Sequence, residues 1–143
     1  MLVDGYNDIK VVKVLSPVAV ALADNTAQVG AIISHLDFGS VTYVIQTGTL
    51  EDSNATFAVT LEHGDDSGLS DTAAVVDGQL IGTLAGASFT YANDGTVTKL
   101  GYIGGKNYSR LTITPSGNTG NAPLSAVCIL GHPRKSPQST QRN

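Results

Sequence analysis

The chain has 143 residues, of which 41% are hydrophobic and only 14% are charged. This length suffices for one domain with a buried core, and the charged share lies well below the roughly 25% of an average soluble domain. The sequence therefore predicts a single domain whose surface is either rich in Ser and Thr or partly covered by partner proteins.

Several classes of protein are excluded at this level. No apolar run reaches the roughly 20 residues that a membrane-spanning helix needs. The segment Met1 to Val14 lacks the apolar core and cleavage site of a signal peptide, so we expect synthesis in a cytoplasm and no membrane partner. Cys128 is the only cysteine, which excludes an intrachain disulfide, and its apolar neighbours predict a buried thiol.

Charge is distributed unevenly along the chain. No Lys or Arg occurs between Lys13 and Lys99, whereas this stretch holds every acidic residue except Asp4 and Asp8. The segment after Gly131 has the opposite character, because it contains Lys and Arg but no acid. An acidic body repels phosphate, so we expect no nucleic-acid partner.

Alternation of apolar and polar residues, which is typical of strands with one buried face, recurs throughout. The clearest strand is Ala55 to Glu62, in which Phe57, Val59 and Leu61 share one face. Further strands are predicted over residues 9–15, 29–35, 41–46, 87–91, 96–103, 108–114 and 124–130.

Turn residues separate these strands. Residues 47–54 are consistent with a hairpin that joins strand 41–46 to strand 55–62, and Asn93-Asp94-Gly95 predicts another tight turn. Residues 69–84 favour a short turn or strand over a helix, because Val75-Val76 and Gly78 weaken helical propensity.

Roughly eight or nine short strands divided by turns predict an all-β fold, either a sandwich or a barrel. We expect an antiparallel β-sandwich over residues 9–131, with extended arms at residues 1–8 and 132–143 that cannot bury enough apolar surface to fold alone. The predicted core residues are Phe57, Val59, Leu61, Leu111, Ile113, Val127 and Ile129.

The search for catalytic or ligand-binding motifs finds none. His35, His63 and His132 lie on separate segments, and the chain has no Gly-x-Ser-x-Gly elbow, P-loop or dinucleotide fingerprint. The acidic segment 62–71 lacks the ligand spacing of an EF-hand, so it predicts a solvated loop. We therefore expect no enzyme activity, no cofactor and no metal ion.

Five segments form a recognisable set: residues 37–44, 59–66, 95–104, 107–111 and 124–134. Taken in order, they resemble a family of small tailed-bacteriophage proteins that are encoded among virion structural genes. The likeness covers roughly residues 25–135. In many relatives a tryptophan-containing strand follows the acidic loop, whereas this chain has Leu69-Ser70-Asp71 at that place.

The resemblance implies a jelly-roll β-sandwich that decorates, or cements, a capsid. The expected partner is the major capsid protein, the expected oligomer is a homotrimer, and the expected location is the capsid surface of the virion. A tail, collar or neck component, a carbohydrate-binding β-sandwich and a hydrolase on a β scaffold are the alternatives. Because neither arm folds alone, the predicted partner-binding residues are Met1, Leu2, Val3, His132, Pro133, Arg134 and Lys135.

Overall fold

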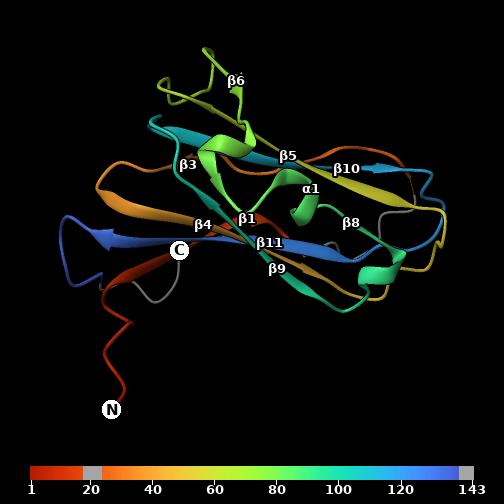
Figure 1. Cartoon of the computed structure of the whole chain (residues 1–143), viewed down its shortest axis with the longest axis horizontal. Helices are drawn as coiled ribbons and strands as arrows, with labels where there is room; N and C mark the ends of the chain where they lie inside the picture. Colours follow the sequence, from red (N-terminus) through yellow and green to blue (C-terminus); the bar gives the residue numbers. More distant parts are fainter. Residues whose placement is uncertain (18–23, 139–143) are drawn as a thin grey trace.

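The computed structural model describes residues 1–17 and 24–138, which form two antiparallel sheets packed face to face (Figure 1). Sheet A has the order β1-β11-β4-β9-β7. Its strands are β1 (Ile9–Leu15), β11 (Leu124–Pro133), β4 (Phe38–Thr47), β9 (Val97–Tyr102) and β7 (Leu80–Ile81).

Sheet B has the order β2-β10-β5-β6, with β3 also paired to β10 and β8 also paired to β5. Three short helices, η1, α1 and η2, lie in the connections around β7 and β8. The remaining elements are β2 (Gln28–Val29), β3 (Ile33–Ser34), β5 (Thr56–Gly64), β6 (Ala73–Ala74), η1 (Asp77–Gln79), α1 (Leu84–Ala87), β8 (Phe89–Thr90), η2 (Tyr91–Asn93) and β10 (Tyr108–Ser116).

The pairing follows a nested pattern. The first strand, β1, pairs with the last, β11; β2 and β3 pair with β10; β4 pairs with β9; and β5 pairs with β6 and β8. A long antiparallel hairpin that is rolled up into two sheets has this connectivity, which is that of a jelly roll. The prediction of an all-β antiparallel sandwich of jelly-roll type is confirmed.

The hairpin predicted over residues 47–54 is wrong. β4 belongs to sheet A and β5 to sheet B, so residues 48–55 cross between the sheets instead of closing a hairpin. Asn93-Asp94-Gly95 forms the predicted turn, in which Gly95 has a φ of 59°. This turn leads from β8 in sheet B to β9 in sheet A. Both edges of β4 are already occupied by β11 and β9, which leaves no place for β5 beside it. Turn residues specify a reversal of the chain but not the sheet that receives the next strand.

Other boundaries also differ from the predictions. The predicted strand 29–35 is two short strands, β2 and β3, on either side of Gly30, whose N–H donates to the Leu111 carbonyl at 2.8 Å. A Cβ atom at Gly30 would lie 2.7 Å from that oxygen, so this close approach requires glycine. Predicted strand 87–91 is shortened to β8, because α1 and η2 flank it. Within residues 69–84, where the sequence favours a short turn or strand over a helix, the structure has the short strands β6 and β7 and, between them, the 3-10 helix η1.

The core lies between the sheets, and five of the seven predicted core residues are in it. Phe57, Val59 and Leu61 from β5 and Leu111 and Ile113 from β10 are all buried. The predictions for Val127 and Ile129 are wrong, because β11 directs the residues of the opposite parity into the core. Residues 126–130 are apolar on both faces of the strand, so alternation does not define which face is inward. The core residues from β11 are Leu124, Ala126, Cys128 and Leu130.

The register of β11 predicts that two adjacent residues contribute unequally to the free energy of unfolding. Replacing Leu130, which is 2% exposed, by alanine should lower the free energy of unfolding by about 2–5 kcal/mol. The Ile129→Ala variant should cost less than half as much, because Ile129 points outward from sheet A. Urea denaturation of both variants measures the difference. Equal losses would contradict the assigned face of β11.

Candidate partner-binding surface

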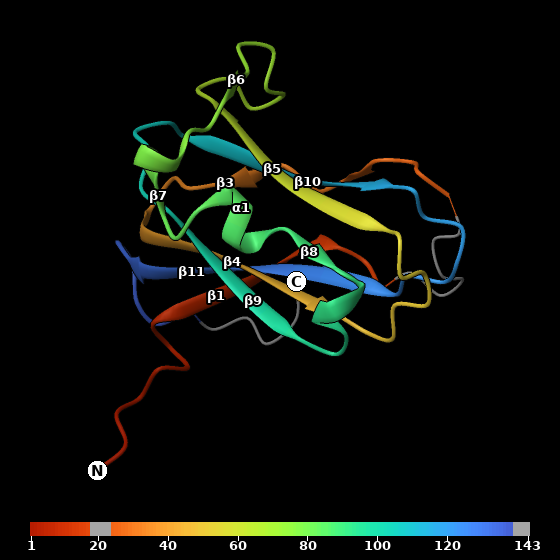
Figure 2. The same ribbon diagram turned by 45° about the vertical axis from the view of Figure 1, so that its right-hand side comes forward.

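The N-terminal segment leaves the sandwich at the start of β1 and extends away from it (Figure 2). Met1, Leu2 and Val3 are exposed. The side chain of Asp4 accepts hydrogen bonds from the backbone N–H groups of Tyr6 and Asn7, and also from Asn7 Nδ2 at 2.7 Å. These bonds lower the pKa of Asp4 and fix a turn just before β1.

The C-terminal segment returns to the same place. β11 continues to Pro133, and the chain then runs beside the residues that precede β1. Both terminal segments therefore meet at one end of the sandwich, which brings His132 to Lys135 close to the start of β1. The two segments are joined by hydrogen bonds that include Ser136 Oγ to Asp8 Oδ1 at 3.1 Å and Gln138 N–H to Asn7 O at 2.8 Å. Arg134 N–H donates to Asp37 O, just before β4, at 2.7 Å.

A hollow of about 510 Å³ opens at this end, between the start of β1, the end of β11 and the first half of β4. Gly131 provides part of its floor, since a Cβ atom there would lie 2.5 Å from Ser40 Oγ. His132 has a left-handed backbone with φ of 51°, and its Nδ1 lies 3.2 Å from Ser40 Oγ. Two of the predicted partner-binding residues, His132 and Pro133, line this hollow.

A second hollow, of about 560 Å³, adjoins the first one. It lies next to β4 on the side of β9, over the end of β9, whereas the first hollow lies on the side of β11. Ser40 and Thr42 line both hollows. Arg134 lines this second hollow, together with the exposed side chains of Ile81 and Ile103. The end of sheet A near the termini is therefore concave and carries both apolar and basic side chains.

Below this concave end, a buried chain of hydrogen bonds joins the two sheets. Tyr43 in sheet A and Ser109 in sheet B are fully buried, and their hydroxyl oxygens are 2.6 Å apart. Ser109 Oγ is also 2.6 Å from His35 Nε2, and His35 Nδ1 is 3.0 Å from the Lys106 carbonyl oxygen. Because that carbonyl can only accept, His35 carries its proton on Nδ1 and accepts from Ser109 through Nε2.

This environment favours the neutral imidazole of His35. Burial lowers the pKa of His35, and the nearby His63 lowers it further, although the Lys106 carbonyl opposes both effects. Burial raises the pKa of the Tyr43 hydroxyl far above its usual range. Ser109 is enclosed between two partners, so this serine–histidine pair serves as a link between sheets.

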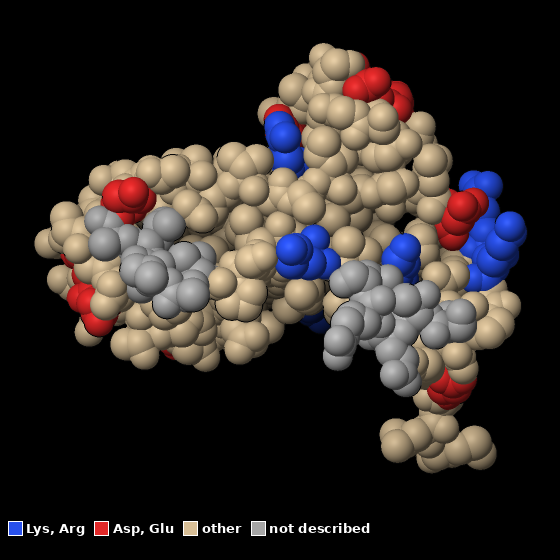
Figure 3. All heavy atoms as spheres, turned by 180° about the vertical axis from the view of Figure 1, so that it is seen from behind, with Lys and Arg blue, Asp and Glu red and all other residues tan. Residues whose placement is uncertain are grey.

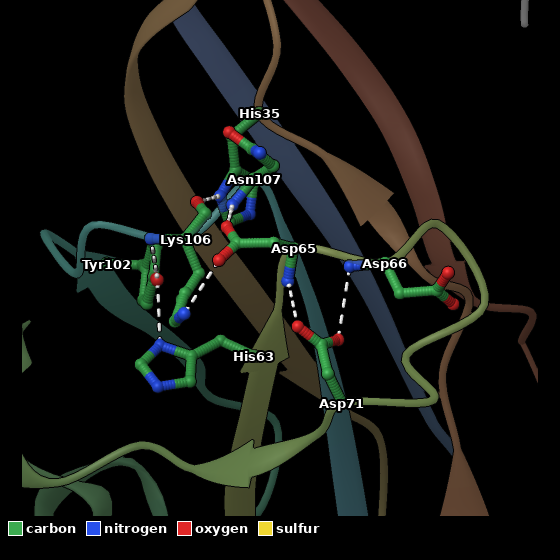
Figure 4. A network of polar contacts seen from close by, with 8 residues as sticks. All are labelled: His35, His63, Asp65, Asp66, Asp71, Tyr102, Lys106 and Asn107. Atoms are coloured by element: carbon green, nitrogen blue, oxygen red, sulfur yellow. Dashed lines mark hydrogen bonds and ion pairs between the residues drawn. The ribbon is translucent and has the colours of Figure 1, made fainter.

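A second link between the sheets lies beside the first. Nδ1 of the buried His63, in β5, is 2.8 Å from the Tyr102 hydroxyl in β9, and the same hydroxyl accepts from the Lys106 N–H at 3.2 Å (Figure 4). The His35 ring packs against the Tyr102 ring with centroids 4.8 Å apart. Burial lowers the pKa of His63, and the Lys106 cation lowers it further.

The acidic loop predicted over residues 62–71 stands out from the body next to these links, in the protrusion that includes β6 (Figures 1 and 4). Its carboxylates bind the loop's own backbone: Asp71 accepts from the N–H groups of Asp65 and Asp66, and Asp66 accepts from Gly68 and Ser70. Asp65 pairs with Lys106 at 2.7 Å. These hydrogen bonds lower the pKa of Asp66 and Asp71.

Within residues 1–17 and 24–138, no group of three or more His, Cys, Asp or Glu side chains is arranged to hold a metal ion. No helix in those same ranges is long and apolar enough to cross a membrane.

The end of the sandwich opposite the termini is acidic. Residues 48–55, 91–96 and 117–123 contain Glu51, Asp52 and Asp94 and no Lys or Arg. These carboxylates fasten the loops to one another, since Asp52 accepts from the Thr119 hydroxyl at 2.8 Å and Asp94 accepts from the Leu50 N–H. Seen from behind, this end shows acidic side chains without basic ones, whereas Lys and Arg lie over the middle and the other end, where acidic side chains also occur (Figure 3).

No protein-family model matches the chain, and no curated protein matches its sequence. Among solved structures, the capsid of Ralstonia phage GP4 is 10% identical with a TM-score of 0.46, and the match covers 99% of this chain and 91% of that one. A chain of infectious bursal disease virus strain Gx is 12% identical with a TM-score of 0.49, and the match covers 94% of this chain and 33% of that one.

A third similar structure is the CBM36-1 domain of a multidomain xylanase from the hindgut metagenome of Trinervitermes trinervoides. It is 12% identical with a TM-score of 0.45, and the match covers 87% of this chain and 98% of that one.

Proposed function

We propose that the chain is a virion structural protein of a tailed bacteriophage, and that it binds the outer surface of the assembled head as a decoration protein. The observation that carries this proposal is the concave end of sheet A, where the start of β1, the segment after β11, exposed apolar side chains and Arg134 come together. The sequence motifs that resemble phage virion proteins support it independently. The proposed partner is the major capsid protein, and the proposed oligomer is a homotrimer.

The proposed role is non-catalytic and works by mass action. A protein that binds the assembled lattice but not its separate subunits stabilises the lattice in proportion to its occupancy. Two hydrogen-bonded links between the sheets, Tyr43–Ser109 and His63–Tyr102, suit a domain that keeps its shape while it binds.

Binding of the purified protein to emptied heads of the phage that encodes it tests the proposal. We expect the protein to sediment with heads, to raise the melting temperature of the heads and not to bind separate capsid subunits. Absence of binding to heads would overturn the proposal, and binding to tails instead would favour the tail or neck alternative. Light scattering at micromolar concentration tests the trimer.

Head binding should depend only weakly on salt. Only 14% of residues are charged, and apolar burial is not weakened by added salt as exposed ion pairs are. A co-sedimentation series from low to moderate salt measures this, with a DNA resin as the control that the acidic body should not bind. Loss of head binding at modest salt, or retention on the DNA resin, would contradict the expectation.

A further inference from the structure

The outer face of sheet A, which points away from the core, is rich in aliphatic side chains, although Ser40, Thr42, Gln46 and Ser125 also lie on it. Outward residues alternate with buried ones along each strand, and the strand register places them in rows across the sheet. Among these side chains, Ile81 is 66% exposed and Val97 is 63% exposed. The outward aliphatic residues of sheet A are Ile9, Val11, Val44, Ile81, Val97, Val127 and Ile129.

The outer face of sheet B has a different composition. Thr60 and Thr112 face each other across β5 and β10, and Thr114 stands opposite Ala58. The Glu62–Arg110 ion pair extends the same polar surface. In the described strands of sheet B, Val29, at 55% exposed, is the single large aliphatic residue that faces outward. The apolar outer surface is therefore a property of sheet A and not of the sandwich in general.

The sequence of β11 points to the same conclusion. Residues 126–130 of this central strand form an unbroken apolar run, which is the pattern of a strand that is covered on both faces. The core covers one of these faces, through Ala126, Cys128 and Leu130. The outward residues Val127 and Ile129 have the composition of a face that receives a second layer of protein.

The charges on this face indicate which kind of protein can bind it. Lys13, Val127, Val44 and Lys99 form one row across β1, β11, β4 and β9. No strand of sheet A contains an Asp or Glu residue within its bounds. If two copies packed through this face, they would bring four lysines together, and like charges across an interface oppose association. The face fits an apolar surface of a different protein that carries carboxylates.

We propose that the outer face of sheet A is the surface that contacts the capsid, and that it packs on an apolar patch of the major capsid protein whose carboxylates lie opposite Lys13 and Lys99. This inference rests on the proposed function. The inference specifies the orientation of the domain: sheet A faces the head, and the polar outer face of sheet B faces solvent.

Cysteine footprinting on heads tests the inference. Single variants Ile81→Cys and Val97→Cys mark sheet A, and Val29→Cys, at a site of similar exposure, is the matched control on sheet B. The native Cys128 gives no background, because it is fully buried and burial raises the pKa of its thiol to about 12. Each variant is labelled with a maleimide, both free and bound to emptied heads.

We expect head binding to slow labelling of the Ile81→Cys and Val97→Cys variants by about tenfold or more, because the core of an interface excludes solvent. Labelling of the Val29→Cys variant should not change. Protection of the Val29→Cys variant with free labelling of the other two would overturn the inference while the proposed function stands. Protection of the Val97→Cys variant without heads would also overturn it, since the occupant would then be a second copy. Wild-type protein that fails to bind heads would overturn the proposed function and the inference with it.

A charge reversal provides the second measurement. The Lys13→Glu, Lys99→Glu double variant should bind heads at least about tenfold more weakly at low salt, because it places carboxylates opposite the carboxylates of the capsid. In the wild type, two lysine–carboxylate pairs add little to affinity, which agrees with the weak dependence on salt expected above. The matched control, Thr60→Glu with Thr114→Glu on sheet B, should bind like the wild type. Unchanged binding of the lysine variant would exclude the proposed carboxylate partner.

Discussion

The protein should lose stability as the pH falls from about 7.5 to about 5, a range in which a histidine in an unfolded chain becomes protonated. Burial lowers the folded-state pKa of both His35 and His63 below 6.5. The stability that comes from their neutral forms is therefore fully present above the unfolded pKa, and it is lost as the pH falls through the folded values. Carboxylates with lowered pKa act in a separate, more acidic window.

The surroundings of His35 and His63 explain why protonation of either ring destabilises the fold. A proton on His35 Nε2 would face Ser109 Oγ, which would then have to turn its own hydrogen away and disturb the bond to Tyr43. A proton added to His63 would place a second charge close to Lys106, although Asp65 and Asp71 partly offset it. Each buried group that loses its partner costs on the order of 1–3 kcal/mol.

Urea midpoints at several pH values measure the effect. The His35→Gln, His63→Gln double variant is the control, and it should be less stable than the wild type at about pH 7.5 but much less sensitive to acid. A wild-type midpoint that is constant between about pH 7.5 and 5 would show that the histidine links do not carry this stability.

Deleting residues 134–143 should abolish most of the binding to heads and leave the melting temperature almost unchanged. The deletion keeps all of β11 and removes contacts of Arg134, Ser136 and Gln138. Those contacts lie at the surface, where a hydrogen bond contributes little to folding. Arg134 lines the hollow of about 560 Å³ on sheet A, and Lys135 lines a further hollow of about 530 Å³ that also borders Asp37 and Phe38. Loss of Arg134 therefore changes the surface proposed to bind the capsid.

Co-sedimentation with heads and a thermal melt of the free protein measure the two effects separately. The Glu51→Gln variant, which changes the acidic end opposite the termini, is the control and should bind normally. Equal affinity with and without residues 134–143 would refute a binding role for the C-terminal segment. A large fall in the melting temperature would instead show that the segment belongs to the folded domain.

Local sequence predicted the faces of some strands but not of others. β5 alternates cleanly, so the inward positions of Phe57, Val59 and Leu61 follow from the sequence alone. The run 126–130 in β11 is apolar on both faces, and only its pairing with β4 decides that Leu130 is inward and Ile129 outward. The outward side of this run belongs to the face that we propose contacts the capsid.

The sheet to which each strand belongs depends on pairing between segments that are far apart in the sequence, and local sequence patterns do not predict it. The segment 47–54 has the residues of a turn, but the sheet in which β5 lies depends on β9 and β11 occupying both edges of β4. These strands are far from β4 in the sequence, and no nearby residue encodes their order. A hairpin was therefore the natural interpretation of a segment that in fact crosses between the sheets.

The sequence also contained a signal for the buried links between the sheets. Ser109 has the same parity as Leu111 and Ile113, His63 has that of Leu61, and each is therefore a polar residue at an inward position. Buried polar groups need hydrogen-bond partners, so a link was foreseeable. The identity of the partners was not, because His35 meets Ser109 only through the register of β3 and β10.

A cryo-EM map of the intact virion tests the central claim most directly. The account predicts many copies of this jelly roll on the outer surface of the head, with sheet A toward the capsid and sheet B toward solvent. Density for the fold only in the tail, collar or neck, or a virion without the protein, would contradict it.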